Sequence, residues 1–66
     1  MQVKVGSLVR HLSYDPMLES VVAKVGIIEK LYTKIQGQGH TYIYWVVNFG
    51  NRKLKIDEYE LEVICK

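Results

Sequence analysis

The sequence predicts an all-β protein whose strands curl into a small five-stranded barrel. Runs rich in valine, isoleucine and aromatic residues fill the chain, and turn residues such as glycine and asparagine separate them. Sixty-six residues make one domain near the lower size limit for independent folding, and 48% of them are hydrophobic. A chain this short encloses a core by wrapping its strands around it, and self-association would add stability.

The first predicted strand is short and covers residues 8–12. Residues 13–16 predict a turn or loop, because Pro16 has a fixed φ and biases Asp15 toward an extended conformation. Residues 17–20 either form a helical turn or continue this loop.

A long strand follows over residues 21–33, with Gly26 inside it. Glycine within a strand marks a bulge or a close approach of another chain segment, and it lets a strand bend sharply. The sequence leaves open whether Ile27 or Ile28 points inward, because a bulge at Gly26 would shift the alternation.

Residues 36–40 predict a flexible polar loop, and residues 42–49 a strand. This strand places Ile43, Trp45, Val47 and Phe49 on one face and Tyr42, Tyr44, Val46 and Asn48 on the other. Both faces are largely apolar or aromatic, whereas a wall strand of a small barrel buries only one. The second face therefore needs a cover, which is a loop, another subunit or a ligand.

The C-terminal part predicts a turn at Gly50, which supplies a positive φ, and then a half-buried strand over residues 52–56. Residues 57–60 suit a single helical or 3-10 turn, and residues 61–64 form a last strand that closes on the first. Five short strands with one long early loop describe an SH3-like barrel, a single domain over residues 1–66.

Charge and cysteine content narrow the class of protein only slightly. Nine lysine and arginine residues against seven acidic ones give a net charge of +2, which is a weak excess for a nucleic-acid-binding domain. Cys65 is the only cysteine, so no internal disulfide is possible, and we expect a cytoplasmic or virion location. Neither a signal peptide nor a membrane-spanning segment is expected.

Three short motifs in order resemble known small barrels. Residues 5–10 (VGSLVR) resemble a "V-G-D-x-V-R" opening, residues 25–29 (VGIIE) a "G-I-V-x-E" strand, and residues 59–64 (YELEVI) an "E-x-L-E-V-I" ending. Together they are similar to small uncharacterised SH3-like barrel proteins of tailed phages, marine phages included. This resemblance spans nearly the whole chain and implies the fold, but it implies little about activity because the fold hosts many functions.

A weaker resemblance links residues 48–51 (NFGN) to the "D-Y-G-N" turn of Tudor domains, which bind methylated lysine or arginine in an aromatic cage. The resemblance places Phe49 and Asn51 at cage positions, with Tyr14 as a loop aromatic. Where a further aromatic is expected, the chain has Val46. The cage is therefore incomplete.

The sequence predicts neither enzymatic activity nor a cofactor or metal site. It also resembles plasmid-encoded dihydrofolate reductases, but their V-Q-I-Y stretch is replaced at residues 53–57 by KLKID. His11, His40 and Cys65 lack the spacing of a metal site, and no serine sits in a nucleophile elbow. The carboxylates of residues 57–62 suit a solvated turn and outer strand face.

The remaining candidates are aromatic and basic residues, and they suit a core or subunit interface, a protein partner, or nucleic acid. The predicted protein-binding set is Tyr14, His40, Tyr42, Tyr44 and Trp45, although Trp45 with Ile43 and Val47 also suits the core. The alternative nucleic-acid-binding set is Lys30, Lys34, Arg52, Lys53 and Lys55. The favoured function is a non-catalytic interaction module that binds a protein or a second copy.

Overall fold

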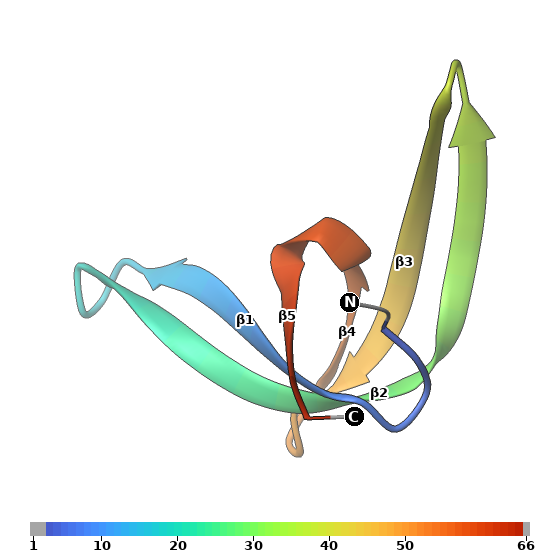
Figure 1. Cartoon of the computed structure of the whole chain (residues 1–66). Coiled ribbons are helices and arrows are strands. Elements are labelled where there is room, and N and C mark those ends of the chain that lie inside the picture. Colours follow the sequence, from blue (N-terminus) through green and yellow to red (C-terminus); the bar gives the residue numbers. More distant parts are fainter. Residues whose placement is uncertain (1–2, 66) are drawn as a thin grey trace.

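The computed structural model describes residues 3–65, which form one antiparallel five-stranded sheet (Figure 1). Its elements are β1 (Leu8–Asp15), β2 (Ser20–Gly37), β3 (His40–Asn48), β4 (Lys53–Asp57), the 3-10 turn η1 (Glu58–Glu60) and β5 (Leu61–Cys65). The strand order is β4-β3-β2-β1-β5. The predicted all-β class, the five strands and the 3-10 turn before the last strand are confirmed.

The long strand β2 organises the sheet, because its first half pairs with β1 and its second half with β3. The two hairpins diverge from the middle of β2, and their tips lie far apart (Figure 1). The molecule is elongated as a result, with extents of 38 × 26 × 21 Å. Surfaces on the two hairpins are therefore separate surfaces.

The sheet is open. Its edge strands β4 and β5 are consecutive in the chain and joined by η1, yet within the described residues no backbone ladder pairs them. The Asp57 carboxylate caps η1 by accepting the Tyr59 N–H at 2.9 Å. This short connection brings the two edges of the sheet together at one end (Figure 1), because three residues cannot span a flat five-stranded sheet.

Two predicted loops are shorter than the sequence suggested. The prediction of a long early loop was wrong, because β1 continues to Asp15 and pairs there with Ser20. Only residues 16–19 form the turn. The predicted loop at residues 36–40 contracts to Gln38 and Gly39, with Gly39 at a φ of 79°. Ladder hydrogen bonds formed with the partner strand outweigh the local preference for a loop in both places.

The core lies on one face of the sheet, and it is small. Its buried residues are Val3, Val9, Ile28, Val47 and Ile56, with Trp45, Phe49, Leu54, Leu61 and Val63 packed against them. Ile28 is 1% exposed and Ile27 51%, which settles the open question of which isoleucine points inward. Within residues 3–65, no helix is long and apolar enough to cross a membrane.

The irregularities of β2 lie after Gly26, not at it. Gly26 is in register with Val9, whereas the pairing with β3 shifts between Ile28 and Lys30 and again between Leu31 and Thr33. Each shift inserts an extra residue in β2, which increases the local bend. Of the two predicted uses of Gly26, the close approach is confirmed, because a Cβ there would lie 2.8 Å from Phe49 Cδ1.

Candidate functional site

The predicted protein-binding residues do not form one surface. Tyr14 lies near the tip of the β1–β2 hairpin, where it pairs with Val21. His40 and Tyr42 lie at the tip of the β2–β3 hairpin, with their ring centroids 6.3 Å apart. The two tips point in different directions (Figure 1), so one small partner cannot contact both groups.

Trp45 lies at the edge of the core. Its ring packs against the core, and its Nε1 donates a hydrogen bond to Glu58 Oε1 at 3.2 Å. This bond ties β3 to η1 and satisfies the indole N–H, as a partly buried tryptophan requires. Trp45 is thus partly buried and packs against the core, in the environment that its alternation with Val47 suits. Tyr44, on the opposite face of β3, is half-buried between its neighbours Thr33 and Asp57.

The β1–β2 hairpin carries an exposed apolar surface on the face turned away from the core. Antiparallel partners share a face, and so do residues two apart along a strand. The register pairs Leu12 with Ala23, Tyr14 with Val21, Arg10 with Val25 and Leu8 with Ile27. We call Leu12, Tyr14, Val21, Val25 and Ile27 the hairpin face. Each of its members is more than half exposed.

The apolar character continues into the turn of this hairpin, where Met17 is 90% and Leu18 65% exposed. Single exposed apolar residues are ordinary, whereas contiguous apolar patches mark interaction surfaces. Of these residues only Tyr14 was predicted. The available signal was the apolar residue at every second position, which runs through Leu12 and Tyr14 and again from Val21 to Ile27. The loop predicted at residues 13–16 interrupted this pattern.

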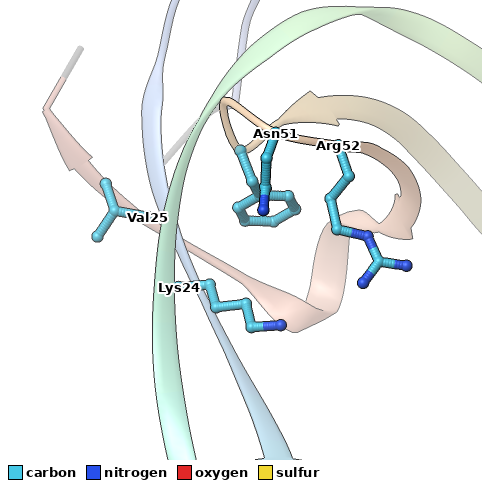
Figure 2. Close-up of a pocket in the computed structure, with 5 residues that line it drawn as sticks. Lys24, Val25, Asn51 and Arg52 are labelled. Atoms are coloured by element: carbon cyan, nitrogen blue, oxygen red, sulfur yellow. The ribbon is translucent and has the colours of Figure 1, made fainter.

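A second feature is a hollow of about 360 Å³ beside the β3–β4 turn (Figure 2). Its lining residues are Lys24, Val25, Phe49, Asn51 and Arg52, and we call it the basic hollow. The charged ends of Lys24 and Arg52 extend into the same region from β2 and from the turn (Figure 2). Within residues 3–65, neither cation has a salt-bridge partner.

Hydrogen bonds within the β3–β4 turn stabilise one side of the basic hollow. The Phe49 N–H donates to the Arg52 carbonyl oxygen at 2.9 Å, and the Gly50 N–H donates to Asn48 Oδ1 at 2.8 Å. Phe49 packs against the core, and its ring edge comes over Gly26. This packing fixes one aromatic side chain in the same hollow as two cations. A methylated cation would meet two positive charges and one ring here, which does not suit a Tudor-type cage.

The predicted nucleic-acid-binding cations are divided among several environments. Lys30 and Lys55 flank Val46 on one face of the sheet, whereas Lys34 pairs with Ile43 on the other face. The Lys55 ammonium lies 4.3 Å from the Tyr32 ring centroid. Arg52 lies in the basic hollow instead. Lys24, which was not in the predicted set, lines the same hollow as Arg52.

Lys53 is engaged by Glu29, with 3.0 Å between Nζ and Oε1, while Asn48 Nδ2 donates to Glu29 Oε2 at 3.2 Å. The hydrogen bond from Lys53 is the main reason that the pKa of Glu29 lies below its ordinary value of 4.5. Partial desolvation acts in the opposite direction. Lys53 is therefore already paired with a carboxylate of the same chain.

Within residues 3–65, no three histidine, cysteine or acidic residues are grouped to hold a metal ion. No protein-family model, curated protein or solved structure matches the chain. The hairpin face and the basic hollow are therefore the two candidate binding surfaces of the described residues.

Proposed function

We propose that the chain is a non-catalytic protein-interaction module built on a partial SH3-like barrel. The order β4-β3-β2-β1-β5, the long bent β2 shared by two hairpins and the 3-10 turn between β4 and β5 support this architecture. The resemblance of the opening, middle and closing motifs to small phage barrels points to the same fold.

The observation that carries the function is the hairpin face. Five apolar side chains on two paired strands are more than half exposed, and they lie opposite the core. Tyr14 adds a ring with a polar end, which suits a partly hydrated interface with a protein. The partner surface has matching chemistry, which is apolar at its centre and polar at its rim.

Selection from a displayed peptide library tests this proposal. We expect enriched peptides with apolar anchors, whose binding shifts the backbone amide resonances of Leu12, Tyr14 and Val21. Tyr14→Lys should weaken binding by about tenfold or more, because it removes an aromatic anchor. His40→Lys, on the other hairpin tip, is the matched control and should bind normally. Peptides whose shifts map onto the β2–β3 hairpin would contradict the proposed surface.

A second candidate function, single-stranded nucleic-acid binding, is favoured by one specific observation. The basic hollow presents two cations without salt-bridge partners in the described chain beside an aromatic ring. Single-strand-binding surfaces combine these groups, with bases stacked on rings and phosphates held by cations. Two phosphate contacts predict weak and salt-sensitive binding.

Fluorescence anisotropy of a labelled oligothymidine tests this candidate at several salt concentrations. With two phosphates neutralised, we expect log K to fall with a slope of about −1.4 against log salt. Arg52→Ala and Lys24→Ala should each reduce the slope by about 0.7. Lys34→Ala, on the β2–β3 hairpin, controls for net charge and should leave the slope unchanged. Anisotropy that stays flat at low salt would remove this candidate.

A further inference from the structure

We infer that the occupant of the hairpin face is a second copy of this chain, which packs through the same face. This inference rests on the proposed function, because it names the partner of that surface. A two-fold arrangement is self-complementary, so one apolar patch serves both subunits. The two faces would meet as in a β-sandwich, with side chains from both sheets interleaved.

The accessible surface of the chain is the first argument. The chain has a mass of 7.7 kDa and exposes 5027 Å². A folded monomer of this mass exposes about 4,300 Å². The excess of roughly 700 Å² is close to the 800 Å² or so that each partner contributes to an interface of standard size. The excess exposed area is thus of the size that each subunit buries in a dimer interface of standard size.

The shape of the molecule is the second argument. The radius of gyration is 12.5 Å, compared with about 11 Å for a compact domain of this length. The projecting hairpins account for the difference (Figure 1), and the β1–β2 hairpin bears apolar residues on its outer face. A projecting apolar hairpin in a chain with few buried residues gains stability when another subunit covers it.

The charge distribution is the third argument. Arg10 is the only charged residue among the paired positions of this face from Leu8 to Tyr14 and from Val21 to Ile27. It forms an ion pair with Glu62 of β5 within the same chain. Lys24 lies between the members of the hairpin face in sequence, but its side chain lies on the opposite face. Two copies can therefore approach without like-charge repulsion, although the chain carries a net charge of +2.

Sedimentation velocity from about 1 to 200 μM tests the inference on the full chain. We expect the wild-type protein to sediment as a dimer at the upper concentrations. Val21→Lys should raise the dimer dissociation constant by about 100-fold, because it places a charge among the apolar side chains that the two copies bury against each other. Ile35→Lys is the matched control, since Ile35 lies on the same strand and is 50% exposed, but outside the hairpin face. This control should dimerise normally.

Val21 is exposed, so Val21→Lys should fold, and the far-ultraviolet circular dichroism of its monomer provides the check. A wild-type chain that is monomeric throughout overturns the inference, and so does a dimer that survives Val21→Lys. The peptide selection separates the two proposals. A monomer that selects hairpin-face peptides keeps the proposed function and loses the second copy, whereas a monomer that selects none loses both.

Discussion

Gly26→Ala should destabilise the fold by about 3 kcal/mol, because three neighbours occupy the place of the new methyl group. A Cβ would lie 2.8 Å from Phe49 Cδ1, 2.8 Å from Val47 Cγ1 and 2.9 Å from the Asn48 carbonyl oxygen. Phe49 can move, but the carbonyl belongs to β3 and moves only with the sheet. Urea unfolding followed by Trp45 fluorescence measures the loss as a lower midpoint at an unchanged slope.

Gly37→Ala is the matched control for this substitution. Gly37 lies in the same strand, its φ is not positive, and no atom lies within 4 Å of a Cβ built there. Its stability should be unchanged or higher by about 0.4–1 kcal/mol, because alanine restricts the unfolded chain. Equal losses for the two alanine variants would show that strand glycine itself, and not the contact with the β3–β4 turn, causes the effect.

Gly26 also shows what the sequence can and cannot predict about this fold. A glycine inside a β-rich run indicates a bulge or a close approach, and both alternatives follow from local chemistry. The choice between them depends on Phe49, which is 23 positions later and reaches Gly26 only after the β3–β4 turn has folded back. The bulges instead follow Ile28 and Leu31, where no residue type signals them.

The strands themselves were largely predictable, because alternation and turn residues act locally. The strand containing Trp45, the positive φ of Gly50 and the turn capped by Asp57 all followed from short sequence patterns. The β1–β2 hairpin was predicted only in part, because the turn signal of residues 13–16 indicates a strand that ends at Leu12. Pro16 lies in the turn itself, where its fixed φ is compatible with a strand that ends at Asp15.

The candidate binding surfaces were less predictable, because they depend on how far β2 bends. Tyr14 and Tyr42 are both exposed, as expected for members of the predicted protein-binding set. The bend in β2 places them at the tips of different hairpins. Lys24 and Arg52 are brought to one hollow by the same folding back that covers Gly26. No spacing between residues 24 and 52 predicts that proximity.

Ile28→Ala should cost about 3–4 kcal/mol, because it removes a buried side chain and leaves a cavity in a core that has few residues to refill it. Ile28 is 1% exposed, pairs with Val47 and donates its N–H to the Ser7 carbonyl oxygen at 3.0 Å. A domain of this length is stable by about 3–10 kcal/mol in total. Ile28→Val, with an expected loss of about 1 kcal/mol, keeps the measurement within range if the alanine variant fails to fold.

Ile27→Ala is the control, because Ile27 precedes Ile28 in β2 but is 51% exposed on the hairpin face. Its loss within the monomer should be small, whereas its effect on the dimer should depend on protein concentration. The unfolding midpoint of Ile28→Ala should instead fall by a similar amount at low and high concentration, because Ile28 packs within one subunit. Greater destabilisation by Ile27→Ala in dilute solution would reverse the inner and outer faces of β2, and the hairpin face would then belong to the core.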